Sequence, residues 1–303
     1  MTAAVSSVLS VQRLCKSFGQ QVVLRDVDLQ VARGELVGLV GKNGAGKSTM
    51  LRILVGIGRR SSGQVSVLGR DPANDPLGIR QNCCYLPGET SVYHGMTGQQ
   101  FLDFALSFYP RLQKELLGEL RDIFDLPLHK KVRGYSAGMK QKLALMATLV
   151  PDVELYLLDE PDRALDASVR FQLRDLLGRM RDAGRTLVLS SHHLAEVETL
   201  ANRLEFLLAG TMVDEDSIRR ARARLQQRFR LRLREQTELP TGLVVLETEP
   251  DGTLVLEADG DPMQRLSSLP AESVLSVELG IARLEELYQL LLAQTESPQE
   301  PKP

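Results

Sequence analysis

The chain has 303 residues, 43% of them hydrophobic, which is enough for one domain with a large core and a smaller second domain. Its 37 basic and 39 acidic residues give a formal net charge of -2, which excludes a global attraction to nucleic acid or anionic membranes. The three cysteines have neither the number nor the spacing of a disulfide framework or zinc site. Without a signal-peptide pattern or an apolar run of roughly 20 residues, we expect a cytoplasmic protein.

The first part of the chain predicts strands followed by a loop and a helix. Residues 8–18 and 20–31 alternate between apolar and polar side chains, which is typical of strands with one buried face. Residues 35–40 form a continuous apolar run of the buried-strand type. A glycine-rich loop follows, and then a helical pattern that ends near Gly56.

The middle of the chain alternates predicted helices and buried strands. Residues 97–125 have helical spacing, interrupted at Pro110 and stopped at Pro127. A helix is expected after Ser136, then a strand over 155–160, a helix over 167–180 and a strand over 186–191. This alternation predicts an α/β fold with a mostly parallel sheet covered on both faces.

Beyond about residue 218 the pattern changes to that of a small α+β unit. Residues 228–235 alternate strictly, residues 242–258 predict a hairpin that turns at Asp251 and Gly252, and residues 281–293 predict an amphipathic helix. The polar, proline-rich tail over 294–303 is expected to be disordered.

A phosphate-binding loop is predicted at "GKNGAGKST", residues 41–49. It matches G-x-x-x-x-G-K-[ST], and it lies between an expected strand and an expected helix, as that motif requires. Glycines in such a loop allow backbone N–H groups to face phosphates. Lys47 would reach the β and γ oxygens, and the Ser48 hydroxyl would ligate Mg²⁺.

Two carboxylates end the predicted strand at "LYLLDEP", residues 155–161. Asp159 would hold Mg²⁺ through water, and Glu160 would act as the general base that polarises the attacking water. A solvated acidic strand end is the alternative, which the phosphate loop in the same chain disfavours. His192 follows the next strand and would contact the γ-phosphate, or it is a histidine in an ordinary loop.

Five motifs together resemble a known family, the ATP-binding subunits of ABC transporters. They are "GKNGAGKST" at 41–49, "YSAGMKQKLAL" at 135–145, "LYLLDEP" at 155–161, "ALDA" at 164–167 and "SSHHLAEVE" at 190–198. The resemblance covers roughly residues 8–218. It implies a P-loop NTPase fold of the ABC type, with an N-terminal antiparallel β subdomain and a helical subdomain at about 90–140. The domain would span residues 1–218, with an accessory α+β domain at 219–293.

The resemblance also implies a site shared by two copies. Two nucleotide-binding domains would dock head to tail, with each ATP between the phosphate loop of one and the signature motif, Ser136, Ala137 and Gly138, of the other. A helix N-cap is the alternative role of Ser136. Phe18 would stack on adenine or be a core aromatic, and Asp166 would signal across the dimer. The ATP contacts implied within one chain are Phe18, Gly41, Asn43, Gly44, Ala45, Gly46, Lys47, Ser48 and Thr49.

Three positions depart from the family pattern. Gly88 stands where the family usually has a glutamine that touches Mg²⁺ and couples to the membrane subunit, and Glu89 is a candidate substitute. Tyr135 replaces the leucine of the signature motif, and Ala137 replaces its first glycine. The sequence therefore defines the coupling of this ATPase to a membrane subunit less well than it defines ATP hydrolysis.

Residues 219–234, "RRARARLQQRFRLRLR", contain eight arginines. On a strand, Arg228, Arg230, Arg232 and Arg234 would share one face, opposite Phe229, Leu231 and Leu233. They would meet lipid head groups or an acidic partner, or they would form a solvated strand face that discourages edge pairing.

The sequence thus predicts an ATP- and Mg²⁺-dependent ATPase subunit of an ABC transporter. It would form a homodimer, or a heterodimer with a related ATPase. This dimer would lie at the inner face of the cell membrane and drive a separate polytopic membrane permease, and the complex would be an exporter. No nucleic acid is expected. The alternatives are a soluble ABC-type ATPase acting on ribosomes or nucleic acid, and a nucleotide-gated module that hardly hydrolyses ATP. The presence of both Glu160 and His192 disfavours the latter.

Overall fold

The computed structural model describes residues 7–191, 194–234, 238–279 and 284–296. The chain divides into two compact units, Met1–Met212 and Val213–Pro303. The first unit contains two sheets and the second contains one. Each unit is described by itself below.

A six-stranded sheet forms the centre of the first unit, with the order β5-β6-β7-β3-β8-β9. Its strands are β3 (Leu36–Val40), β5 (Cys83–Leu86), β6 (Leu155–Asp159), β7 (Thr186–Ser191), β8 (Arg203–Leu208) and β9 (Thr211–Met212). All neighbours pair in parallel except β8 and β9. Every residue of β3, β6 and β7 is buried, which explains their continuous apolar runs.

A second, antiparallel sheet contains β1 (Ser7–Phe18), β2 (Gln21–Ala32) and β4 (Ser62–Val67), in the order β2-β1-β4. Its buried residues, among them Leu9 and Val11, share a core with Met50 and Leu54 of α1 (Lys47–Leu54) and with Leu39 of the central sheet. This is the expected N-terminal antiparallel β subdomain.

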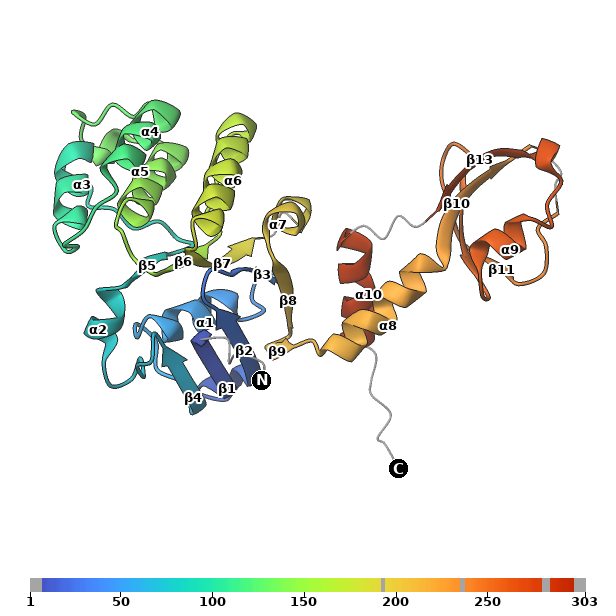
Figure 1. Ribbon diagram of the computed structural model, residues 1–303, viewed down its shortest axis with the longest axis horizontal. Coiled ribbons are helices and arrows are strands. Elements are labelled where there is room, and N and C mark those ends of the chain that lie inside the picture. The colour runs from blue at the N-terminus through green and yellow to red at the C-terminus, as the bar shows by residue number, and fades with distance from the viewer. Residues whose placement is uncertain (1–6, 192–193, 235–237, 280–283, 297–303) are drawn as a thin grey trace. The chain divides into compact units, whose positions relative to one another are not determined.

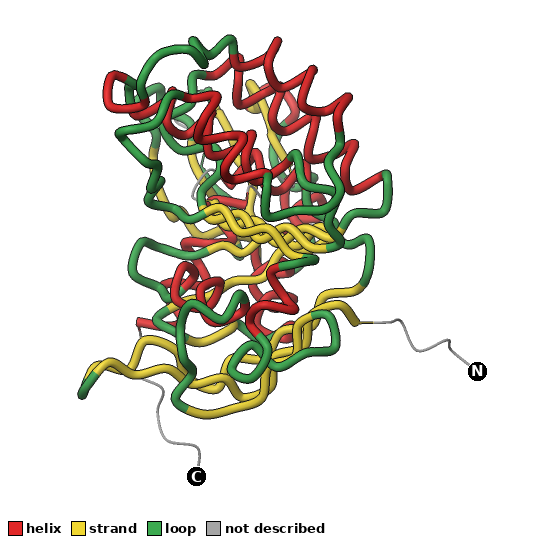
Figure 2. Tube along the Cα trace, turned by 90° about the vertical axis from the view of Figure 1, so that its left-hand side faces the viewer, coloured by secondary structure: helices red, strands yellow, loops and turns green. Residues whose placement is uncertain are grey.

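Helices cover the other face of the central sheet. Figures 1 and 2 show α3, α4, α5 and α6 on one side of this sheet, while α1 and the antiparallel strands lie on the other. The helices of this unit besides α1 are α2 (Pro76–Arg80), α3 (Gly98–Leu106), α4 (Lys114–Phe124), α5 (Ala137–Leu149), α6 (Ala167–Asp182) and α7 (Leu194–Leu200), with a 3₁₀ turn at Val132–Gly134.

The local sequence explains these helices. Leu116, Leu120 and Phe124 follow one another at four-residue spacing on α4, and all three are buried in the core of the helical side. Thr97 caps α3 in a capping box with Gln100. The helical pattern predicted over residues 97–125 is therefore present as two helices, α3 and α4.

The second unit contains a four-stranded antiparallel sheet with the order β11-β12-β10-β13. Its elements are α8 (Glu215–Gln226), β10 (Arg228–Leu233), β11 (Leu243–Thr248), β12 (Leu254–Ala258), α9 (Pro262–Leu266), a 3₁₀ turn at Ala271–Ser273, β13 (Val274–Leu279) and α10 (Leu284–Glu296). Phe229, Leu231, Leu256, Ala258 and Leu269 form its core. The predicted hairpin is β11 and β12, whose loop contains Asp251 and Gly252.

Acidic side chains within the second unit bind the arginines of β10. Glu257 accepts from Arg224 and Arg228 at 3.1 Å each. Arg230 lies 2.9 Å from Glu249, 3.5 Å from Glu278 and 3.8 Å from Glu286. These pairs favour the interpretation of a solvated strand face over that of a site for lipid head groups.

None of the helices in the described ranges is both long enough and apolar enough to span a lipid bilayer.

Candidate nucleotide-binding site

Glycines shape the phosphate loop between β3 and α1. Gly46 has φ 107°, and a Cβ atom there would lie 2.6 Å from Leu24 Cδ2. A Cβ atom on Gly41 would lie 2.3 Å from the Leu207 carbonyl oxygen. Only glycine fits at either position, and its lack of a side chain lets the loop pack against the antiparallel sheet and β8. The loop leads into the N-terminus of α1, where the first N–H groups of a helix can bind an anion.

Lys47 links the phosphate loop to the predicted catalytic carboxylates. Its side chain is buried, and Nζ donates to the carbonyl oxygens of Gly41 and Lys42. Burial lowers the pKa of Lys47, while the nearby charges of Glu160 and Asp159 act in the opposite direction. Three residues predicted from two separate motifs therefore lie within electrostatic reach of one another.

Asp159, at the end of β6, has the surroundings of a cation ligand. It is 1% exposed, and its Oδ1 accepts a hydrogen bond from Ser190 Oγ at 2.6 Å. Its other oxygen, Oδ2, is buried and has no hydrogen-bond partner. A buried carboxylate oxygen without a partner is costly unless a cation neutralises it. The residue therefore fits the Mg²⁺ ion that accompanies ATP.

No group of three or more His, Cys, Asp or Glu side chains within the described ranges is arranged to hold a metal ion. Mg²⁺ in nucleotide sites is held by one or two protein oxygens together with phosphate oxygens and water, so a site of this kind needs no such group. Glu89, the candidate substitute ligand, is exposed.

Glu160 lies in a tight turn with φ 49°, which is rare for a residue other than glycine and costs about 1 kcal/mol or more. Its N–H donates to Ser190 O at 3.0 Å and contacts Ser190 Oγ at 3.1 Å. Gln141 Nε2 donates to the carbonyl oxygens of Glu160, at 3.3 Å, and Pro161, at 3.1 Å. The surrounding structure thus fixes the unusual backbone of the proposed general base.

The signature residues form the N-terminus of α5. Ser136 is its N-cap, and Ser136 Oγ accepts from Met139 N at 3.2 Å. A Cβ atom on Gly138 would lie 2.7 Å from Ala164 O, so this turn packs closely on the loop before α6. Ser136 therefore is an N-cap, as the alternative interpretation predicted. This does not exclude the predicted contact with a second chain, because the capping serine lies on an exposed helix end.

Tyr135, which departs from the family pattern, has a structural role. Its ring is 5% exposed, and its hydroxyl donates to Pro127 O at 2.9 Å. The side chain therefore joins the start of the signature to the first part of the loop that follows α4.

Asp166 is the N-cap of α6 and accepts from Val169 N at 3.0 Å. That hydrogen bond, and to a smaller degree the charge of Lys142, lowers the pKa of Asp166. Lys142 Nζ lies 3.9 Å from its carboxylate and connects the loop to α5.

The remaining residues predicted to contact ATP differ in how far they are exposed to solvent. Phe18 is 57% exposed with Lys16 Nζ 4.3 Å above its ring, so the core-aromatic alternative is wrong. Ser48 and Thr49 are half-buried in the first turn of α1, and Asn43 and Gly44 are exposed in the loop. Ala45 is buried there, and Ala137 is exposed at the start of α5. His192 lies outside the described residues.

The sequence did not predict Ser190, Gln141 or Arg163 as parts of this site. Arg163 Nη1 donates to Gly88 O at 2.8 Å. Gln141 is 2% exposed and lies among the apolar residues that α5 buries. A buried polar side chain needs hydrogen-bond partners, so a glutamine on this apolar face is the signal in the sequence that could have indicated its role.

A parallel α/β sheet whose carboxyl ends gather a phosphate loop and two acidic residues defines a P-loop NTPase. Comparison with known proteins agrees. The family model described as ABC transporter matches residues 24–163. An uncharacterized ABC transporter ATP-binding protein, all4389 of Nostoc sp., is 37% identical over 66% of this chain, and the match spans 61% of that protein's length.

Two further matches cover more of the proteins compared. The daunorubicin resistance ATP-binding protein DrrA3 of Streptomyces coeruleorubidus is 30% identical over 88% of this chain and 84% of its own length. A solved structure of an ATP-binding subunit of an ABC transporter is 31% identical, with a TM-score of 0.65 over 70% of this chain and 92% of that one. The chain therefore belongs to the ABC transporter family, as an ATP-binding subunit and an ATPase.

Proposed function

We propose that this chain hydrolyses ATP in a head-to-tail dimer, either with a second copy or with a related ATPase. Each ATP would lie between Lys47 of one copy and Ser136 and Gly138 of the other. The observation that carries the proposal is the meeting of Lys47, Asp159 and Glu160 at one edge of the sheet, with a buried carboxylate oxygen left for a cation.

The chemistry follows from the positions of these side chains. Glu160 takes a proton from water as the water oxygen bonds to the γ-phosphorus, and the bond between that phosphorus and the β,γ-bridging oxygen breaks, which releases ADP. Lys47 and the N–H groups of α1 stabilise the negative charge on the phosphates. When bound, Mg²⁺ would supply further positive charge and would be held by Asp159 and Ser48. His192 is proposed to position the water.

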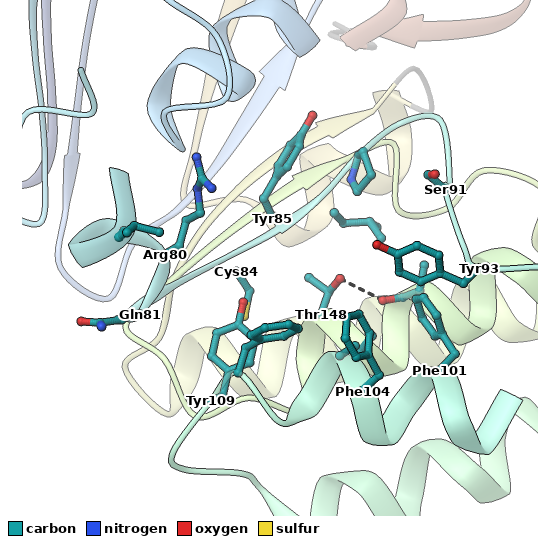
Figure 3. A pocket seen from close by; sticks show the side chains of 17 residues that line it. Arg80, Gln81, Cys84, Tyr85, Ser91, Tyr93, Phe101, Phe104, Tyr109 and Thr148 are labelled. Atoms are coloured by element: carbon teal, nitrogen blue, oxygen red, sulfur yellow. Dashed lines mark hydrogen bonds between the residues drawn. The ribbon is translucent and has the colours of Figure 1, made fainter. Parts of the chain in front are cut away.

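A separate pocket supports docking to a membrane subunit. It has a volume of about 670 Å³ and lies between the start of the helical subdomain and β5. Figure 3 shows the rings of Tyr93, Phe101, Phe104 and Tyr109 along one side. Tyr93, Phe104 and Phe108 stack edge to face and are 58%, 40% and 64% exposed. Such an exposed aromatic group is typical of an interaction site, and we infer that a polytopic permease occupies it.

Export is the proposed direction of transport, at the inner face of the cell membrane. DrrA3 is named for resistance to a drug, and this chain resembles it over both units. A ribosomal or nucleic-acid partner is disfavoured, because three arginines of the second unit, Arg224, Arg228 and Arg230, already have acidic partners within it.

The direct test of the catalytic assignment is Glu160→Gln. The amide cannot accept the proton, so kcat should fall by about 10²-fold or more while ATP still binds and accumulates in a stable dimer. Glu154→Gln is a matched control, because Glu154 directly precedes the same strand and pairs with Arg33 at 2.6 Å. A Glu160→Gln protein with the parent's kcat would show that another group is the base.

The docking assignment is tested with Phe108→Glu. A charge in the aromatic pocket should abolish copurification of a polytopic membrane protein from detergent extracts made with ATP present. Phe171→Glu is the control, because Phe171 is 62% exposed on α6 and does not line the pocket. Equal recovery of the membrane protein with both variants would exclude this pocket as its binding site.

A further inference from the structure

The loop between β5 and α3 lies between the nucleotide site and the aromatic pocket. Pro87 and Ser91 line the pocket. Between them, a Cβ atom on Gly88 would lie 3.1 Å from Asp159 Oδ2, the buried oxygen without a hydrogen-bond partner. Because Gly88 has no side chain, the loop can lie directly against the proposed magnesium ligand.

Two polar links join this loop to the turn that carries Glu160. In the first, Arg163 Nη1 donates to Gly88 O at 2.8 Å. In the second, the Thr90 hydroxyl hydrogen-bonds to Gln141 Oε1, and Gln141 Nε2 donates to the carbonyl oxygens of Glu160 and Pro161. Arg163 belongs to the turn itself, because its N–H donates to Glu160 O at 3.2 Å.

We propose that Arg163 is a positioning residue for ATP hydrolysis, which holds the loop at Gly88 in place relative to Asp159 and Glu160. The inference rests on the proposed roles of these two carboxylates. The connection runs through a main-chain carbonyl, because position 88 has no side chain to make it. A partner that displaces Pro87 or Ser91 in the pocket would thereby move the turn that carries the general base.

The properties of Arg163 suit this role. A charged donor forms a stronger hydrogen bond to a carbonyl than a neutral one. The residue is exposed, so its loss leaves no cavity in the core. The second link, in contrast, uses the buried Gln141, whose replacement would also disturb the packing of α5.

The test compares Arg163→Ala and Arg163→Lys with the parent in the full-length chain. Kinetics with MgATP, binding of a fluorescent ATP analogue, and hydrogen exchange of residues 86–92 are measured for each. Arg121→Ala is the matched control, because Arg121 is also exposed and donates to Gln99 of a neighbouring helix at 3.2 Å.

Arg163→Ala should lower kcat by about tenfold or more, since a small misplacement of a catalytic group has a large effect on rate. The KM for ATP and analogue binding should change less than about twofold, because Lys47 and the phosphate loop are untouched. Exchange at 86–92 should accelerate. Arg163→Lys, which keeps one donor, should recover part of kcat, and Arg121→Ala should match the parent.

Parent-like kcat in Arg163→Ala would overturn the inference. So would a lowered Tm with unchanged exchange at 86–92, which would assign Arg163 a purely structural role. If instead Arg163→Ala behaves as expected while Glu160→Gln retains full activity, the positioning role stands and the proposed general base is wrong.

Discussion

Adjacent carboxylates in this chain have very different surroundings. Asp159 is buried and faces Ser190, whereas Glu160 is half-buried and has a left-handed backbone. The sequence predicted both residues, because an acidic pair at the end of a buried strand is visible in one short stretch. It did not predict the contact with Ser190, because that residue lies 31 positions away on another strand and only the parallel register brings it close.

Lys47→Met tests the electrostatic state of the phosphate loop. Burial lowers the pKa of Lys47, so between that pKa and the ordinary lysine value the unfolded chain binds more protons than the folded one. The free energy of unfolding of the parent should therefore rise with pH in this range, relative to that of Lys47→Met. Urea unfolding at pH 8 and pH 10 measures this difference. ATP should raise the Tm of the parent but not that of the variant.

An unchanged pH dependence in Lys47→Met would show that the lysine is not desolvated in the folded chain. If ATP stabilised both proteins equally, Lys47 would not be a nucleotide contact.

Tyr135→Phe tests why tyrosine replaces leucine in the signature. The substitution removes one buried hydrogen bond and leaves Pro127 O without this donor, so the free energy of unfolding should fall by about 1–2 kcal/mol. Urea unfolding checks the value. Tyr93→Phe is a control at a 58% exposed ring, where no comparable loss is expected. Equal losses in the two variants would contradict the structural role of Tyr135.

At the scale of elements, three central strands and most helices of the first unit followed from the sequence, whereas β5 and β8 were not predicted. Continuous apolar runs marked β3, β6 and β7, because both faces of these strands are covered. Helix α8 was not predicted, because only Ala221 and Leu225 are buried among its arginines and its apolar face is too short to show a period. Strand β13 was missed because its mostly exposed residues mix apolar and polar side chains without a buried face.

Gly138→Ala tests the packing between α5 and the loop before α6. A methyl group there would approach Ala164 O to 2.7 Å, so the helix start or the loop must move. We expect a loss of stability of about 1–3 kcal/mol and a lower kcat. The control is Gly134→Ala, because a Cβ atom at that position meets nothing within 4 Å. If both variants behaved like the parent, this close packing would not matter for the signature.

At the scale of the whole molecule, the two units have separate sheets and cores. A chain that ends at Met212 should therefore fold, with cooperative urea unfolding and a Tm that ATP raises. Failure of this shorter chain to fold would show that the first unit depends on the second.

The central claim is that two copies share each ATP site, and the most direct measurement mixes two inactive variants. Lys47→Ala damages the phosphate loop and Ser136→Arg damages the signature, so each alone should lack ATPase activity. An equimolar mixture should recover about a quarter of the parent's rate, since about half of the dimers are mixed and each mixed dimer has one intact site of two. A mixture that stays inactive, although cross-linking confirms mixed dimers, would contradict the shared site.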